Sequence, residues 1–207
     1  MKRILFIGDS ITDAGRNYDK DSDAGRGYVQ FIKAHLGLEN PQEYEILNRG
    51  INCDRVVDLY GRIKKDIINL KPDIVSILIG VNDAGHNMWP MPNGLDEDKY
   101  YIVYDMLISD IKEALPDVKI IILEPFILNG DSIEQFWPVI GEEVEKRAAM
   151  AQKISEKHGL TFVPLQAGID ELCKKAPNSW WLGDGIHPTA MGHEFIKWEW
   201  LKAFNTL

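Results

Sequence analysis

The stretch Arg3-Ile4-Leu5-Phe6-Ile7-Gly8-Asp9-Ser10-Ile11-Thr12 holds an apolar run followed at once by polar side chains. The apolar run predicts a buried strand, because strands covered on both faces are continuously apolar. Gly8 ends the run and Ser10 follows it. Ligands of open α/β sheets bind beyond the carboxyl ends of the strands. Ser10 is therefore the predicted nucleophile, and its hydroxyl needs a base, an orienting acid and donors for an oxyanion.

The rest of the chain alternates between strand-like and helix-like stretches. Further apolar runs predict strands at residues 44–47, 74–79, 119–123 and 161–164. Amphipathic stretches predict helices at about residues 28–36, 54–70, 98–115, 139–158, 168–175 and 189–204. This order is typical of βαβ units around a parallel sheet. We predict a single domain over residues 1–207, a flavodoxin-like, three-layer α/β/α sandwich with a five-stranded parallel sheet and the long loops on one rim.

The composition limits the classes of partner. The 207 residues include 23 Lys and Arg against 32 Asp and Glu, which gives a formal net charge of −9. An acidic chain disfavours nucleic acid and anionic membranes as partners, because both attract basic patches. The sequence contains neither a spanning segment nor the apolar core of a secretory signal, which predicts a cytoplasmic protein. Cys53 and Cys173 have no metal-ligand spacing, so we expect reduced thiols, no metal and no cofactor.

The predicted base lies near the C-terminus. The segment Asp184-Gly185-Ile186-His187-Pro188 falls in a polar loop just before the last predicted helix. Histidine takes up and returns a proton near neutral pH. An aspartate three residues earlier can fold back, accept from the other ring nitrogen and fix the tautomer. We therefore predict that Asp184 orients His187 and that His187 activates Ser10.

Four other histidines compete for the role of base. His35 and His158 lie on predicted helices, where a surface position is expected. His86 lies in a rim loop without an acid at an orienting spacing, and His193 is expected to pack or cap on the last helix. Because a base needs an orienting partner, His187 is preferred over all four.

The developing oxyanion of acyl transfer needs fixed hydrogen-bond donors. The main-chain N–H of Ser10 is one candidate. Gly50, after the second predicted strand, allows close approach of the backbone, and Asn82, after the third, offers an amide donor. Gly50 as a simple turn glycine and Asn82 as a turn or capping residue are the competing interpretations. Convergence of three strand ends on one rim favours the oxyanion hole.

Four segments of the chain resemble, in order, the four blocks of the SGNH (GDSL-type) hydrolases. They are Gly8-Asp9-Ser10-Ile11-Thr12, Asn48-Arg49-Gly50, Gly80-Val81-Asn82-Asp83 and Asp184-Gly185-Ile186-His187-Pro188. The resemblance implies a serine esterase with Ser10 as nucleophile, His187 as base and Asp184 as orienting acid. It also implies an oxyanion hole of Ser10, Gly50 and Asn82. Within the family the chain looks most like the intracellular carbohydrate acetylesterases, such as acetylxylan esterases, which often form oligomers.

Tryptophans on or beside the rim loops suggest a platform for sugar rings, because aromatic faces stack on sugars. Trp89 and Trp181, together with Asp9 beside the nucleophile, are the predicted substrate contacts. Burial of each tryptophan in the core is the competing interpretation. Trp198 and Trp200 cannot share a helix face, so we expect one to pack on the sheet. The other is expected to be exposed and to mark a subunit contact of a homo-oligomer.

The sequence thus predicts an esterase that removes a short acyl group, most simply acetyl, from a small-molecule substrate such as an acetylated oligosaccharide. A lysophospholipase or thioesterase with the same residues would instead prefer long acyl chains. A flavodoxin-like binding or receiver module, with Asp9 as phosphoacceptor or metal ligand, is the third alternative. It leaves Asn82 and the loop of His187 without a role.

Overall fold

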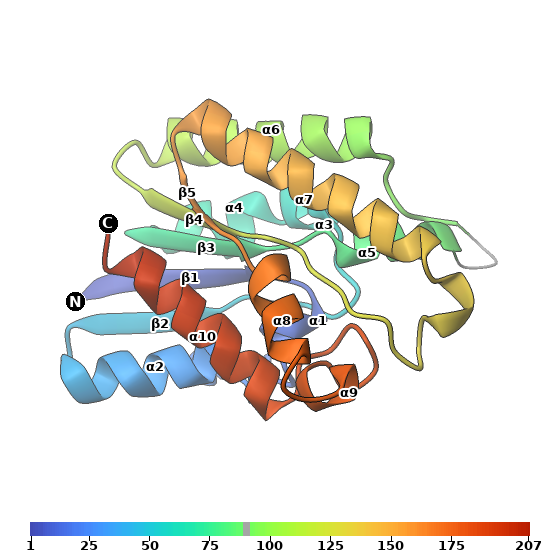
Figure 1. Ribbon diagram of the computed structural model, residues 1–207. Coiled ribbons are helices and arrows are strands. Elements are labelled where there is room, and N and C mark those ends of the chain that lie inside the picture. Colours follow the sequence, from blue (N-terminus) through green and yellow to red (C-terminus); the bar gives the residue numbers. More distant parts are fainter. Residues whose placement is uncertain (89–91) are drawn as a thin grey trace.

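A computed structural model describes residues 1–88 and 92–207 and contains a parallel sheet with helices on both faces (Figure 1). The strand order is β2-β1-β3-β4-β5. The strands are β1 Lys2–Gly8, β2 Tyr44–Asn48, β3 Ile74–Leu78, β4 Lys119–Leu123 and β5 Thr161–Val163. All neighbouring strands are parallel. The predicted five-stranded sheet and the flavodoxin-like, three-layer architecture are therefore confirmed.

The first strand lies inside the sheet, as its apolar sequence predicts. Leu5 of β1 is in register with Leu47 of β2 on one side and with Val75 of β3 on the other. Successive side chains of a strand point to opposite faces. Ile4 and Phe6 accordingly join the core on one face, and Leu5 and Ile7 join the core on the other. Ser10, the predicted nucleophile, thus follows a strand that is fixed on all sides.

The helices form two layers, with α2 and α10 below the sheet in Figure 1 and α6 and α7 above it. Their bounds are α1 Ser10–Asp13, α2 Tyr28–Glu39, α3 Val56–Gly61, α4 Ile63–Asp66, α5 Val81–Gly85, α6 Glu97–Ala114, α7 Val139–His158, α8 Gln166–Cys173, α9 Asn178–Trp181 and α10 Ala190–Phe204. Short 3₁₀ turns occur at Ile68–Leu70, His86–Met88 and Glu134–Phe136. Both chain ends lie at the amino ends of the strands, away from α1 and α9.

Two predicted helices differ from those observed. The helix expected to end at Gly37 continues to Glu39, because one interior glycine costs only about 1 kcal/mol and Leu36 is buried beside it. The single helix expected over residues 54–70 is divided into α3, α4 and a 3₁₀ turn. The break lies at Arg62, whose backbone leaves the helical region (φ −113°, ψ 12°) while its guanidinium pairs with Asp54.

The two tryptophans of α10 behave as predicted. Trp200 is fully buried, and its Nε1–H donates to Ser76 Oγ on β3 at 3.0 Å. Its ring packs against Phe6 of β1. Trp198 is 53% exposed. The homo-oligomer that this exposed ring favours stays a prediction.

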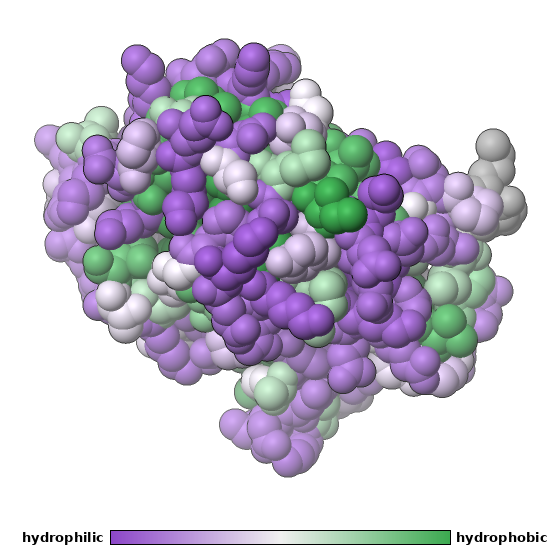
Figure 2. Space-filling model, turned by 90° about the horizontal axis from the view of Figure 1, so that it is seen from above, coloured by the Kyte–Doolittle hydropathy of each residue, from purple (hydrophilic) through white to green (hydrophobic). Residues whose placement is uncertain are grey.

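The face of the molecule that α6 and α7 cover is largely polar. Figure 2 views the molecule from the side of α6 and α7 and shows a mostly hydrophilic face with small, separate hydrophobic patches. In the described ranges 1–88 and 92–207, none of the helices combines the length and the apolar character that a membrane span requires.

Candidate active site

Ser10 is the first residue of α1, directly beyond β1. Asp9 is the N-cap, and its Oδ1 accepts from the Ile11 N–H at 2.9 Å. The first N–H groups of a helix have no partner within the helix. The Ser10 N–H also has no acceptor elsewhere in the described part of the chain. The local structure therefore presents a hydroxyl and a free main-chain donor at the same residue.

Ser10, His187 and Asp184 form a continuous hydrogen-bonded series. Ser10 Oγ lies 2.9 Å from His187 Nε2. His187 Nδ1 lies 2.7 Å from Asp184 Oδ2. The three residues come from opposite ends of the sequence, 177 positions apart for Ser10 and His187. Covalent catalysis requires a nucleophile within hydrogen-bond distance of a base, and a base within hydrogen-bond distance of an orienting group. The three side chains meet both requirements.

The loop of Asp184 is held by its own main chain. Asp184 Oδ1 accepts from the N–H groups of Ile186 at 2.9 Å and His187 at 2.7 Å. Burial alone would raise the pKa of Asp184, but these bonds and the bond from the imidazole hold it below its ordinary value. The Asp184 carbonyl also accepts from the Ser132 N–H at 3.2 Å, which ties the loop to the segment after β4. The acid is thus kept ionised and aimed at the ring.

Three of the four competing histidines are engaged elsewhere. His35 lies 3.4 Å from Glu39 on α2, and His158 lies 2.7 Å from Asp105 on α6. His193 is buried and stacks on Tyr28, as its predicted packing role requires. Burial lowers the pKa of His193 to about 4, with a smaller contribution from His187, so this ring is neutral near pH 7.

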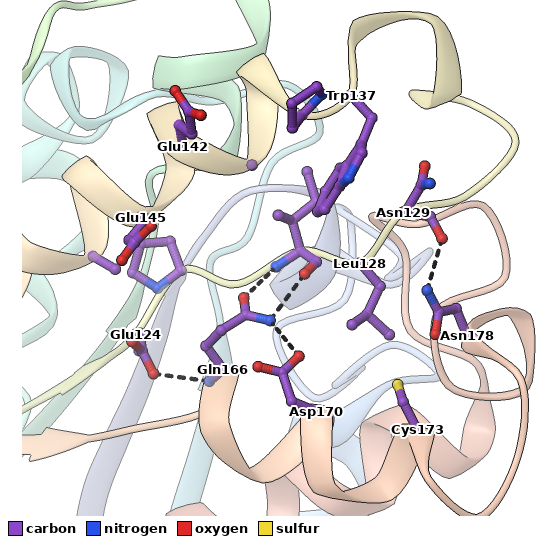
Figure 3. A pocket seen from close by; sticks show the side chains of 15 residues that line it. Glu124, Leu128, Asn129, Trp137, Glu142, Glu145, Gln166, Asp170, Cys173 and Asn178 are labelled. Carbon is purple, nitrogen blue, oxygen red and sulfur yellow. Dashed lines mark hydrogen bonds between the residues drawn. The ribbon is translucent and has the colours of Figure 1, made fainter.

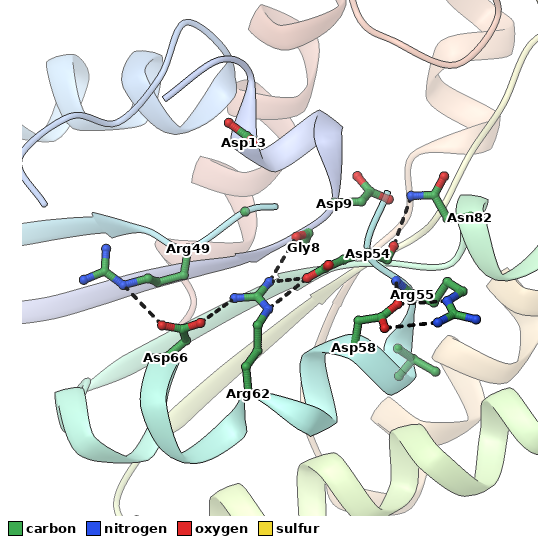
Figure 4. A network of polar contacts seen from close by, with 12 residues as sticks. Gly8, Asp9, Asp13, Arg49, Asp54, Arg55, Asp58, Arg62, Asp66 and Asn82 are labelled. Carbon is green, nitrogen blue, oxygen red and sulfur yellow. Dashed lines mark hydrogen bonds and ion pairs between the residues drawn. The ribbon is translucent and has the colours of Figure 1, made fainter. Parts of the chain in front are cut away.

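Asn82 is held at the same rim on α5. Its Nδ2 donates to the Asp54 carbonyl at 3.0 Å, which fixes the amide and leaves its second hydrogen without a recorded acceptor among the described residues. Figure 4 shows the series of charges that positions Asp54. Arg62 pairs with Asp54 at 2.7 Å and with Asp66 at 3.1 Å, and Arg49 lies 4.0 Å from Asp66.

Gly50 differs from its predicted role. Its N–H donates to Asn48 Oδ1 at 2.8 Å, so in this arrangement it is not free to bind an oxyanion. Asparagine side chains commonly bond the main chain two residues on, which is the physical reason for the difference. A Cβ at Gly50 would lie 2.2 Å from the Asp13 nitrogen. The glycine is therefore needed for close packing of this turn against α1.

Cys53 is the residue of this loop that sequence reasoning missed. Its φ is +67°, a region that non-glycine residues rarely adopt. It is exposed, and it precedes Asp54, whose carbonyl holds Asn82. No acceptor for the Cys53 N–H is recorded within the described ranges. In the sequence, the polar residues that follow Gly50 are the one signal that this loop places further groups at the site.

The two predicted substrate contacts that the structure describes, Asp9 and Trp181, do not line the cavity beside Ser10. Asp9 is 1% exposed beneath α1, so it caps the helix instead of lining the cavity beside Ser10. Burial raises the pKa of Asp9 to about 7. Trp181 lines a neighbouring apolar groove with Trp198, and not that cavity. Trp89 lies outside the described residues.

Two cavities lie near the carboxyl ends of the strands, and one of them is lined by the loop of His187. The catalytic cavity has a volume of about 320 Å³ and is lined by Ser10, Ile11, Ala14, Arg26, His187, Pro188, Ala190 and His193. A second cavity of about 540 Å³ lies between α7 and α8 (Figure 3). Trp137 and Leu128 form part of its apolar wall, and the lining carboxylates come from Glu124, Glu142, Glu145 and Asp170. The catalytic cavity is the one lined by Ser10 and His187, and Asp184 lies behind it, hydrogen-bonded to the far side of the His187 ring.

Asp83, next to Asn82, gives the protein a pH-dependent stability. It is fully buried, and its carboxylate accepts from the Val56 N–H at 3.1 Å. Burial raises its pKa to about 7. Between about pH 4 and pH 7 the folded state then binds more protons than the unfolded state, so the free energy of unfolding falls as the pH rises.

We expect Asp83→Asn to remove this contribution. Relative to wild type, the slope of unfolding free energy against pH in that window should become less negative by about 1.4 kcal/mol per pH unit. Urea unfolding at several pH values measures it. Asp117→Asn, at an exposed position, is the control. Equal slopes in wild type and Asp83→Asn would contradict the assignment.

Comparison with known proteins agrees with this geometry. Residues 6–195 match the family model of the GDSL-like Lipase/Acylhydrolase family. The chain is 31% identical over 202 residues to an acetylxylan esterase of Geobacillus stearothermophilus, covering 94% of this chain and 90% of that one. The crystal structure of that organism's acetylxylan esterase has a TM-score of 0.87 at 28% identity, over 98% of this chain and 93% of the other.

A crystal structure assigned to the GDSL-like lipases, from Parabacteroides merdae, is also similar. Its TM-score is 0.91 at 33% identity, and the match covers 100% of this chain and 96% of the other. Because the family match spans most of the sequence, the binding-module alternative is set aside. The chain belongs to the GDSL-like lipase/acylhydrolase family and is a carboxylic ester hydrolase.

Proposed function

We propose that the protein removes acetyl groups from carbohydrates through an acyl-Ser10 intermediate. The observation that carries the proposal is the hydrogen-bonded series of Ser10, His187 and Asp184, at 2.9 Å and 2.7 Å. The similarity to acetylxylan esterases supports the acetyl group and the sugar. Crystal structures described as catalytic mutants of the Geobacillus enzyme, with a serine or an aspartate replaced by alanine, support the triad.

In the first half-reaction, Ser10 Oγ attacks the ester carbonyl while His187 Nε2 takes its proton. Asp184, hydrogen-bonded to Nδ1, holds the ring and stabilises the imidazolium that forms. Collapse of the tetrahedral intermediate breaks the bond to the alcohol oxygen. His187 returns the proton to that oxygen, the deacetylated sugar leaves, and the acetyl group remains on Ser10.

In the second half-reaction, water takes the place of the alcohol. His187 removes a proton from the water as it attacks the acyl carbonyl, and then returns the proton to Ser10 Oγ. Acetate leaves and the free enzyme is restored. This sequence needs no group beyond the three side chains, the oxyanion donors and water.

The proposed oxyanion donors are the N–H of Ser10 and the side-chain amide of Asn82, with the N–H of Cys53 as the third. Three facts support this set. The Asn82 amide is fixed by the Asp54 carbonyl. Cys53 adjoins Asp54 and has a positive φ. The Gly50 N–H is bonded to Asn48 Oδ1. A role for Gly50 itself requires that bond to open during catalysis.

We expect Asn82→Ala to lower kcat by about 10²- to 10³-fold, because a fixed donor to the oxyanion is lost in the transition state. The thermal unfolding midpoint should change little, since Asn82 is only partly buried. Steady-state kinetics with an acetyl ester measures the effect. Asn87→Ala, at an exposed position on the following turn, is the matched control. A kcat equal to wild type would remove Asn82 from the oxyanion hole.

The function is tested by hydrolysis of para-nitrophenyl esters of increasing acyl length, followed by release of acetate from acetylated xylo-oligosaccharides. The proposal predicts that kcat/KM falls as the chain lengthens and that acetate is released from the sugar. A rise toward long chains would favour the lysophospholipase or thioesterase alternative. If the enzyme hydrolysed the aryl acetate but released no acetate from any sugar, the assignment as an esterase would stand and the assignment of a carbohydrate substrate would be wrong.

A further inference from the structure

The catalytic cavity contains a positive charge that the proposed triad and oxyanion donors do not use. Arg26 lines this cavity of about 320 Å³ together with Ser10 and His187. Its side chain is exposed. A Cβ built on Gly15 would lie 2.8 Å from Arg26 Nη1, so the guanidinium lies over that glycine. The charge is therefore at the cavity wall and accessible to a substrate.

The backbone on both sides of Arg26 is fixed. Gly25 has φ +80°, and a Cβ there would lie 2.4 Å from the Asp13 carbonyl oxygen. A Cβ at Gly27 would lie 2.6 Å from His193 Cε1. The Arg26 N–H donates to the Ala14 carbonyl at 2.9 Å. Two close-packed glycines and one main-chain bond thus hold Arg26 against α1, which limits the positions that its side chain can reach.

The other arginines around the site have partners. Arg49 pairs with Asp21, Arg55 with Asp58, and Arg62 with Asp54. Arg16 donates to the Gly50 carbonyl. Within residues 1–88 and 92–207, Arg26 makes no ion pair and its guanidinium donates no hydrogen bond.

A guanidinium without an ion pair in a catalytic cavity is well suited to bind an anion. The protein as a whole is acidic, with a formal net charge of −9, whereas this cavity holds an unpaired positive charge. Its planar fork matches a carboxylate in a bidentate geometry. Asp23 is the nearby carboxylate: the main-chain bond from Gly25 and, to a smaller extent, the charge of Arg26 lower its pKa. Its two oxygens accept from the main chain of Gly25 and Asn17, and it forms no ion pair with Arg26 within the described residues.

We propose that Arg26 binds a carboxylate on the alcohol part of the substrate, so that the enzyme prefers acetyl esters of acidic sugars over neutral ones. This inference rests on the proposed acetylesterase function. An acetyl group carries no carboxylate, so the carboxylate that Arg26 binds must belong to the sugar. An oligosaccharide with a uronic acid unit is an example. Arg26 is a binding residue that sets specificity and takes no part in proton transfer.

The test compares para-acetoxybenzoate with its uncharged methyl ester. The ratio of kcat/KM for the two esters is measured in wild type, Arg26→Ala and Arg26→Lys. The intrinsic reactivities of the esters cancel when this ratio is compared between variants. Arg26→Ala should lower the acid-to-neutral ratio about tenfold, which corresponds to loss of one hydrogen-bonded charge pair. Arg26→Lys should give an intermediate ratio, because the charge remains without the fork.

Lys20→Ala is the matched control, since it removes one positive charge from the same segment at an exposed position. Its ratio should equal that of wild type. A ratio in Arg26→Ala equal to wild type would overturn the proposal. The proposal would also be overturned if Lys20→Ala lowered the ratio as much as Arg26→Ala does, because the effect would then come from the net charge of the protein.

A second pair of substrates tests the natural setting. Acetylated xylo-oligosaccharides with and without a glucuronic acid unit should be distinguished by wild type and much less by Arg26→Ala. A preference for para-acetoxyphenyl phosphate over para-acetoxybenzoate that depends on Arg26 would overturn the carboxylate in favour of a phosphate. If wild type hydrolyses none of these esters, the proposed function fails. If it hydrolyses them with a ratio independent of Arg26, only the present inference fails.

Discussion

Ser10→Ala is expected to lower kcat for an aryl acetate by about 10⁶-fold, to the level that the remaining oxyanion donors and binding contacts provide. The reason is chemical, since removal of Oγ leaves no group to form the covalent intermediate. The fold should be unaffected, because Ser10 is only partly buried and the one hydrogen bond of its Oγ within the described residues is with His187. Steady-state kinetics and near-UV circular dichroism measure the two effects.

Ser22→Ala serves as the control for this variant. It makes the same chemical change on an exposed position of the loop that follows α1. Its kcat should equal that of wild type. If Ser10→Ala retained more than a hundredth of the wild-type kcat, Ser10 would not be the nucleophile, and the position of α1 beyond β1 would need another explanation.

His187→Ala is expected to have an effect of the same size, about 10⁶-fold in kcat, because the residues of a triad act as a unit. The variant loses the group that lies 2.9 Å from Ser10 Oγ and that is proposed to take its proton and return it to the leaving alcohol. Added imidazole should restore part of the activity, because the small base can occupy the space that the side chain leaves. Kinetics with and without imidazole measure the loss and the rescue.

The histidines that compete in the sequence provide the controls. His158→Ala removes a ring bonded to Asp105, far from Ser10 in the fold, and should leave kcat unchanged. His86→Ala should likewise retain turnover. Full activity in His187→Ala, with loss of activity in His86→Ala, would transfer the role of base to His86.

The sequence was sufficient to predict most of the architecture. The apolar run from Arg3 to Ile7 is explained by a strand that is paired on both sides, and β3 is buried throughout, as its composition predicts. The helix over Val139–His158 has its predicted bounds. These predictions rest on periodicity and on burial, which are local properties of the chain. The proximity of Ser10 and His187 followed from the rule that ligands bind at one rim of a parallel sheet.

What the sequence could not predict depends on contacts between distant groups. Gly50 was expected to point its N–H at the substrate, but Asn48 folds its side chain onto that N–H. Asp9 was expected to contact substrate, but it caps α1 and is buried. Trp181 follows the turn of α9 into a separate groove. In each case the sequence allows the residue more than one position or hydrogen-bond partner. Only the folded structure shows which of them is adopted.

The division of α3 from α4 has the same origin. The residues from Val56 to Ile67 have helical periodicity, so the sequence favours one continuous helix. Arg62 instead pairs with Asp54 and Asp66 and breaks the helix, which brings the Asp54 carbonyl to Asn82 (Figure 4). A local irregularity in the helix is thus linked to the position of a proposed oxyanion donor.

If an acyl group is carried on Ser10 during turnover, it can be trapped there before it is hydrolysed. The enzyme is mixed with para-nitrophenyl acetate, quenched in acid within the first turnovers, digested and mapped by mass spectrometry. The account predicts one added acetyl group on the peptide that contains Ser10, and none in Ser10→Ala. An acetyl group on the exposed thiol of Cys53 in place of Ser10, accumulating and decaying at the rate of turnover, would contradict the account.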